Sequence, residues 1–245
     1  LPLNVSRELL QQDPEVQAIK AAITRRVLDL LAKLAADEPE KYRTFWGAFG
    51  NVLKEGLIED PGNRERLVPL LRFASTAGEG QRHSAADYIA RMPAGQKDIY
   101  YLSADSEAAA RASPQLEGLR ARGVEVLLFT DHIDPWVLTT LDEIDGHALR
   151  DVGSGELGFD GLPAPAQAAG APAELPELCA RVATSLGARV AGVRTSRRLQ
   201  ESAACLVRDA TDPGPQLRRM LEAAGQALPA ARPWLELNAA QPLIA

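Results

Sequence analysis

The chain has 245 residues and a formal net charge of −6 at pH 7, with 46% hydrophobic and 24% charged residues. This globular and acidic composition carries no basic tract, which argues against a nucleic-acid partner. No apolar run approaches the roughly 20 residues that cross a bilayer, and no signal pattern opens the sequence, so we expect no membrane partner.

The first segment, LPLNVSRELLQ, contains a polar pattern that core packing does not explain. An Asn or a Ser can cap a helix that starts near Arg7, and Gln11 would share one helix face with Arg7. A cation near a helix N-terminus opposes the helix dipole, which suggests that Arg7 faces an anion, either a carboxylate or a phosphate. The alternative is a solvated Arg7 paired with Glu8 or Asp13.

Two long helices are predicted next. Asp13 and Pro14 suit the cap and first position of a helix that ends near Ala36, and Pro39 starts a second helix that ends at Gly56. Each helix carries an apolar stripe at a spacing of three and four residues, which we assign to helix packing. The stripes comprise Val16, Ile19, Ile23, Val27, Leu30 and Leu34, and then Tyr42, Phe45, Trp46, Phe49 and Leu53.

Residues 72–152 alternate strands with helices, which predicts a small α/β sandwich with a mainly parallel sheet. The predicted strands are 73–75, 99–102, 124–129 in the centre and 147–152 at an edge, with a loop at 76–82. The predicted helices are 84–92, opened by a capping box at Ser84, then 105–123, broken near Pro114, and one that starts at Asp134 and extends through Ile144.

Residues 153–176 contain four glycines before Leu162 and then a Pro/Ala run, which predicts a linker. The last part, 177–245, predicts a small α+β domain. Its expected elements are a helix at 178–186, paired strands at 189–194 and 204–207, a helix at 215–225 and a final strand at 234–237. The predicted fold class is therefore α/β, mixed with α+β: a helical coil, a small α/β sandwich and an α+β domain.

No complete catalytic motif occurs in the sequence. It has no GxxxxGK[ST] phosphate loop, no GxGxxG and no GxSxG. Asp131, His132 and Asp134 cluster beside a strand end, where a surface loop explains them. Cys179 and Cys205 lack metal-ligand spacing and make no disulfide framework, so we predict no metal site and a cytoplasmic protein.

Two groups of apolar residues are candidates for protein binding. Trp136 lies early on its predicted helix, where an apolar side chain need not face inward, although core packing is the alternative. Leu217, Met220 and Leu221 form one face of a short helix, and such flexible side chains suit adaptable binding to varied partners.

The opening segment resembles the loop-and-helix signature of the middle domain of the heat shock protein 90 family, in its bacterial form. Further stretches match that family in the same order: 55–76, 87–102, 124–128 and 235–243. Ordered matches over such a span are more specific than one short motif. The resemblance covers nearly the whole chain except roughly 153–176, where the family usually has a charged helical segment.

The resemblance implies a segment of an ATP-dependent molecular chaperone. Arg7 would reach the γ-phosphate of ATP, bound with Mg²⁺ in a separate N-terminal domain, and Gln11 would support that contact. Trp136 matches an aromatic residue at a client-contact surface, and the helix at 215–225 would face client protein, although prolines shorten it here. Residues 1–152 would be a middle-domain segment, divided at 71/72 into the catalytic loop with helical coil and the small α/β subdomain.

The same resemblance makes 177–245 a C-terminal domain truncated before the dimerisation helices. The full-length protein would be a homodimer that binds unfolded or partly folded clients and docks its own N-terminal ATPase domain. Two rival hypotheses remain at this point. The chain could be an ATP-independent interaction scaffold, or a free-standing α/β enzyme with a cleft formed by residues 103–134.

Overall fold

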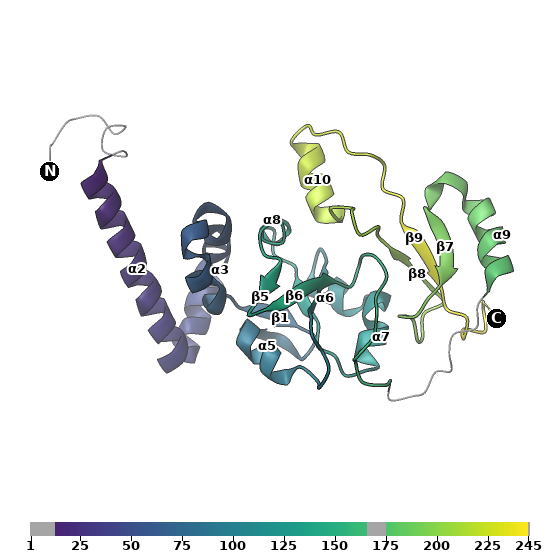
Figure 1. The fold of residues 1–245 in the computed structure, drawn as a ribbon, viewed down its shortest axis with the longest axis horizontal. Coiled ribbons are helices and arrows are strands. Elements are labelled where there is room, and N and C mark those ends of the chain that lie inside the picture. The colour runs from purple at the N-terminus through teal and green to yellow at the C-terminus, as the bar shows by residue number, and fades with distance from the viewer. Residues whose placement is uncertain (1–12, 166–174, 245) are drawn as a thin grey trace. The chain divides into compact units, whose positions relative to one another are not determined.

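The computed structural model describes residues 13–165 and 175–244, and the chain divides into two compact units (Figure 1). The first unit extends to Arg72, and the second begins at Phe73. Helices and two mixed sheets together make up the second unit, which confirms the predicted fold class. The predicted boundaries inside 73–245 stay a prediction.

The first unit contains only helices among its described residues. They are α2 (Pro14–Asp37), α3 (Pro39–Glu59), η1 (Pro61–Asn63), α4 (Arg64–Leu67) and η2 (Val68–Leu70). The predicted start of α2 is confirmed, because the Asp13 side chain accepts a hydrogen bond from the Glu15 amide at 2.8 Å. The end predicted at Gly56 is wrong, because α3 continues to Glu59 and Gly56 instead makes room for the Leu67 side chain.

Tyr42 anchors α3 to the end of this unit. Its hydroxyl donates a hydrogen bond to the Leu70 carbonyl, and the Arg72 guanidinium lies 4.7 Å from the ring centroid. On α2, the buried residues are Leu28 and Leu31, so the predicted apolar stripe is not the packed face. Four members of that stripe are exposed: Ile19, Ile23, Val27 and Leu30.

A six-stranded sheet forms the centre of the second unit, in the order β2-β1-β4-β3-β6-β5. Its strands are β1 (Phe73–Ser75), β2 (Gly78–His83), β3 (Ile99–Ser103), β4 (Leu127–Phe129), β5 (Glu143–Ile144) and β6 (His147–Asp151). β3 pairs in parallel with β4 and β6, and the outer pairings are antiparallel. The sheet is therefore mixed rather than mainly parallel. β4 is central, as predicted, but β5 covers β6, and a strand replaces the predicted loop at 76–82.

Short helices cover this sheet. They are α5 (Ala85–Arg91), α6 (Glu107–Arg111), η3 (Pro114–Leu116), α7 (Glu117–Arg120) and α8 (Asp134–Val137). The capping box at Ser84 is confirmed, and Gly123 follows α7 with a φ of 67°. α8 is one turn long, so the longer helix predicted from Asp134 through Ile144 is wrong, because the chain returns to the sheet edge as β5. Part of the predicted linker packs against the hydrophobic core that includes Leu119 of α7, through Leu157, Phe159 and Leu162.

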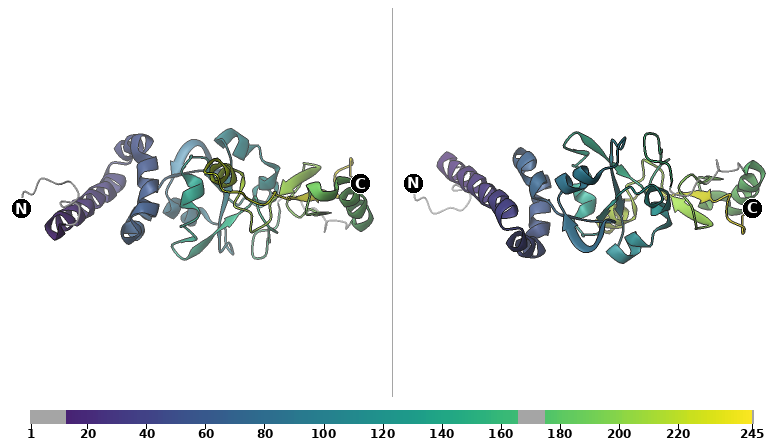
Figure 2. Two further views of the ribbon diagram at one scale, coloured as in Figure 1. Left: turned by 90° about the horizontal axis from the view of Figure 1, so that it is seen from above. Right: turned by 90° about the horizontal axis from the view of Figure 1, so that it is seen from below.

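The second sheet has three strands in the order β7-β9-β8. The strands are β7 (Gly192–Thr195), β8 (Ala204–Val207) and β9 (Trp234–Leu237). The helices of this part of the chain are α9 (Pro176–Leu186), η4 (Gly187–Arg189) and α10 (Pro215–Ala223). β7 was predicted to pair with β8, but β9 lies between them, parallel to β7 and antiparallel to β8. α9 packs along β7, whereas α10 lies beside α8 of the larger sheet (Figure 2).

Tyr88 of α5 connects β3 to the segment that precedes β4, inside the core of the larger sheet. The fully buried Tyr88 hydroxyl donates to the Glu125 carbonyl at 2.8 Å and accepts from the Tyr100 amide at 3.1 Å. Tyr88→Phe would leave both backbone groups unsatisfied, so we expect it to lower the free energy of unfolding by about 2–3 kcal/mol. Urea denaturation measures this loss. Tyr100→Phe is the control, with an expected loss below about 0.5 kcal/mol; equal losses would contradict the prediction.

Candidate functional site

The two predicted catalytic residues, Arg7 and Gln11, lie outside the described residues. Their roles therefore stay predictions. The predicted client-binding residues, by contrast, all lie on described helices of the second unit.

Trp136 lies on α8, next to the end of the parallel part of the larger sheet. α8 starts with Asp134 and Pro135, a favourable first turn, and the Asp134 carboxylate accepts the Asp131 amide at 2.9 Å. Asp134, Pro135 and Val137 are buried, whereas Trp136 is half-buried. The buried residues of the turn thus fix the helix, and the indole remains partly open to solvent.

The second predicted group lies on α10, nine residues long. Leu217, Met220 and Leu221 are all half-buried, and no residue of α10 is fully buried. Polar contacts attach this helix to the segment after β3: Gln216 Nε2 donates to the Ala104 carbonyl at 2.7 Å, and Arg219 pairs with Asp105. Both partners of that ion pair are well exposed, so the pair contributes little to stability.

The structure brings the two predicted groups to neighbouring helices, since α8 and α10 contact each other. A crevice of about 220 Å³ lies between them. Pro135 and Leu138 line it from the α8 side, and Leu217 lines it from α10. The Asp151–Arg208 ion pair and Tyr101 also line this crevice, and burial raises the pKa of the Tyr101 hydroxyl, which therefore stays protonated.

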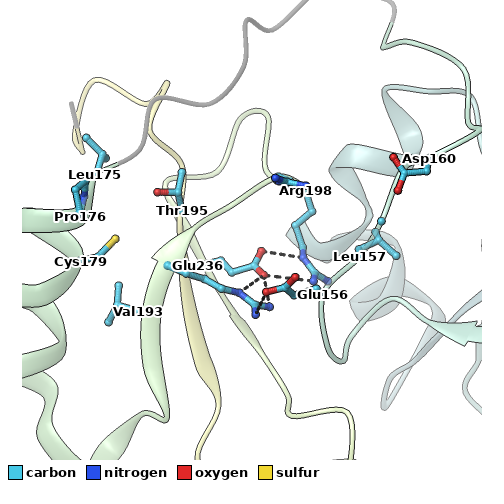
Figure 3. Close-up of a pocket in the computed structure, with 13 residues that line it drawn as sticks. Glu156, Leu157, Asp160, Leu175, Pro176, Cys179, Val193, Thr195, Arg198 and Glu236 are labelled. Carbon is cyan, nitrogen blue, oxygen red and sulfur yellow. Dashed lines mark hydrogen bonds and ion pairs between the residues drawn. The ribbon is translucent and has the colours of Figure 1, made fainter.

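A larger pocket of about 970 Å³ lies in the C-terminal part of the unit (Figure 3). One wall comes from α9 and β7, with Cys179 and Val193, and the opposite wall carries Leu157 and Asp160. Arg198 and Glu236 point toward one another between these walls. Neither residue was predicted as part of a site. A glutamate inside the otherwise apolar strand β9 does, however, indicate a buried charge that needs a cationic partner.

Ion pairs compensate the charges of Arg194, Arg198 and Glu236 in this pocket. Glu236 accepts Arg198 Nε at 2.9 Å, Arg194 Nη2 at 2.8 Å and the Ser196 hydroxyl at 2.8 Å. Arg198 is 1% exposed and Glu236 is 4% exposed. Arg198 also donates to the carbonyls of Val152 and Gly155, so it joins the smaller sheet to the chain that leaves β6. This cluster is a structural joint rather than a reactive group.

The remaining candidates provide no reactive site. Burial raises the pKa of the Cys205 thiol to about 12, which keeps it protonated and unreactive. Asp131 and Asp134 belong to the turn that starts α8, and His132 is exposed beside them. Within residues 13–165 and 175–244, no group of three or more His, Cys, Asp or Glu side chains could hold a metal ion. No helix among those residues is both long and apolar enough to cross a bilayer.

Comparison with known proteins gives one consistent result. The family model described as Hsp90 protein matches residues 1–245. A protein of Halorhodospira halophila called chaperone protein HtpG is 48% identical over 243 residues, which is 97% of this chain and 38% of that protein. Proteins of the same name from Dechloromonas aromatica and Burkholderia cenocepacia are 46% and 48% identical, over 100% of this chain.

The chain spans about two-fifths of the length of these curated relatives, since the matched shares are 38%, 39% and 40%. The family model covers every residue of the chain, and the relatives match nearly all of it. The predicted family is thereby confirmed: the chain belongs to the Hsp90 protein family and is similar over almost its entire length to bacterial HtpG chaperones.

Proposed function

We propose that this chain works as the middle and C-terminal part of an ATP-dependent molecular chaperone that binds unfolded or partly folded client proteins. The observation that carries the proposal is the contact between α8 and α10. Around one small crevice it places Leu138, which follows α8, and Leu217 of α10, both half-buried. Trp136, Met220 and Leu221 lie on the same two helices, outside the lining of the crevice. Flexible apolar residues beside a shallow crevice suit binding to many short apolar segments.

The proposal includes ATP hydrolysis in the whole chaperone. ATP and Mg²⁺ would be bound by a separate N-terminal domain, and Arg7 would stabilise the charge that develops on the γ-phosphate. Gln11 would orient Arg7 or the phosphate. The chain by itself is expected to hydrolyse no ATP, and the whole chaperone is expected to act as a cytoplasmic homodimer.

Client binding can be tested on the chain itself. We expect Trp136→Ala to weaken binding of a soluble unfolded probe, reduced and carboxymethylated α-lactalbumin, by about 5- to 30-fold, because a buried aromatic contact contributes about 1–2 kcal/mol. Leu217→Ser together with Met220→Ser should have an effect of similar size. Fluorescence anisotropy of the labelled probe measures the affinity.

The matched control is Phe49→Ala, which removes a large apolar side chain that is 52% exposed on α3 of the first unit. It should leave the affinity unchanged. Thermal melting of each variant checks that the fold is retained. Equal losses for Trp136→Ala and Phe49→Ala would mean that the probe binds apolar surface in general, and the proposed client site would be wrong.

A further inference from the structure

Three consecutive backbone amides between β7 and β8 converge on one carboxylate. Gln200 N–H and Glu201 N–H donate to Glu117 Oε2 at 2.6 and 2.9 Å, and Ser202 N–H lies 3.2 Å from both carboxylate oxygens. The Ser202 hydroxyl donates to Glu117 Oε1. Successive amides that face the same side form a concave anion-binding nest.

Side chains on both sides of this loop in the sequence, Ser196 and Asn238, hydrogen-bond to its backbone. Asn238, which is 5% exposed, donates from Nδ2 to the carbonyls of Gln200 at 3.2 Å and Ser202 at 3.0 Å. The Ser196 hydroxyl accepts the amides of the two residues that precede Gln200, at 3.1 and 3.2 Å. Because these contacts to the loop do not involve Glu117, we expect the three amides to keep their direction when Glu117 is replaced.

Glu117 comes from a distant part of the chain, the first turn of α7 on the larger sheet. It lies 83–85 residues before its partners. The next residue, Gly118, allows α7 to approach, because a Cβ there would be 2.8 Å from the Arg198 carbonyl oxygen. No ion pair joins Glu117 to a cation within the described ranges, so amide and hydroxyl donors are what stabilise its charge.

The electrostatic effect on Glu117 agrees with this geometry. Burial by itself would raise the pKa of the carboxyl, but the hydrogen bonds from Ser202, Gln200 and Glu201 outweigh it, and the pKa lies below its ordinary value. The pocket therefore prefers the charged form of its occupant.

We propose that residues 200–202 form an oxyanion socket whose built-in occupant is the Glu117 carboxylate. The contact between α7 and the smaller sheet is thus a carboxylate side chain bound in a preformed anion site. When that side chain is absent, a small free carboxylate can bind in the same site. This inference is independent of the proposed chaperone function.

Glu117→Ala with sodium formate tests the socket directly. We expect the variant to melt about 4–10 °C below the wild-type chain, because several charge-assisted hydrogen bonds are lost. Formate, titrated at constant ionic strength against sodium chloride, should regain part of that loss. It should also shift the amide NMR signals of Gln200, Glu201 and Ser202 saturably in Glu117→Ala and leave them unchanged in the wild type.

Glu143→Ala is the control, because it removes an exposed carboxylate from β5 of the same unit, outside the socket. It should neither lower the melting temperature nor respond to formate. If formate leaves Glu117→Ala unaffected, or acts equally on Glu143→Ala, the preformed socket is refuted.

Glu117→Gln keeps the side-chain volume and serves if the alanine variant does not fold. We expect hydrogen exchange of the three amides to become about tenfold faster, because a neutral acceptor binds an amide more weakly than a charged one. Unchanged exchange would show that the charge of Glu117 does not hold the joint, and the proposal would be overturned.

Discussion

Arg7→Ala in the full-length chaperone is expected to reduce ATP turnover by about a hundredfold or more while nucleotide binding is retained. A guanidinium at the γ-phosphate stabilises charge that grows in the transition state, so its loss lowers kcat and leaves the ground-state affinity nearly unchanged. A hundredfold loss corresponds to about 2.7 kcal/mol of transition-state stabilisation. Steady-state turnover and equilibrium nucleotide binding are the two measurements.

Arg26→Ala is a suitable control for this experiment, because Arg26 is an exposed arginine on helix α2, which follows Arg7 in the sequence. It should leave turnover unchanged. Arg7→Lys should recover only part of the rate, since an ammonium cannot reproduce the forked contacts of a guanidinium. If Arg7→Ala turns over ATP at the normal rate, Arg7 is a surface residue, and the ATP-independent scaffold becomes the better hypothesis.

Arg198→Ala should lower the free energy of unfolding of the second unit by about 3–5 kcal/mol. The substitution removes the fully buried partner of the Glu236 carboxylate, which is 4% exposed, and leaves Arg194 as its remaining cation. It also removes the donors to the Val152 and Gly155 carbonyls. Buried groups that lose a charged partner or their only donor produce some of the largest single-residue losses. Urea denaturation followed by far-UV circular dichroism and by tryptophan fluorescence measures the loss.

The neighbouring residue provides a close control. Arg197→Ala removes the same charge from an exposed position, so we expect a change within about 0.5 kcal/mol. The double variant Arg198→Met, Glu236→Met should lose less than Arg198→Ala, because no carboxylate is then left buried without Arg198. A loss below about 1 kcal/mol for Arg198→Ala would contradict the role of this pair as a joint.

Local signals in the sequence predicted local structure well. Asp13 with Pro14, and the capping box at Ser84, mark helix starts that the structure confirms, because a cap joins residues only two or three positions apart. Gly56 shows the limit of such signals. A glycine near the expected end of a helix suggested a stop, but here it makes space for Leu67, which the local sequence does not place.

Strand pairing could not be obtained from the same signals. β7 and β8 are consecutive along the chain and were predicted to pair, yet β9 separates them. Each strand has an apolar pattern that several neighbours could satisfy, and the choice depends on contacts across about 40 residues. α8 was predicted too long for a related reason, because Ile144 serves the edge strand β5 rather than a helix face.

By itself, the sequence determined the family and the mixed fold class, and it suggested the residues of α8 and α10 that we propose for the client site. Only the tertiary structure decided that these two helices meet, and that Glu117 and Arg198 hold the smaller sheet to the larger one. The physical reason is distance along the chain. Periodicity and caps act within a few residues, whereas a carboxylate finds amides 83–85 residues away only after both segments have folded.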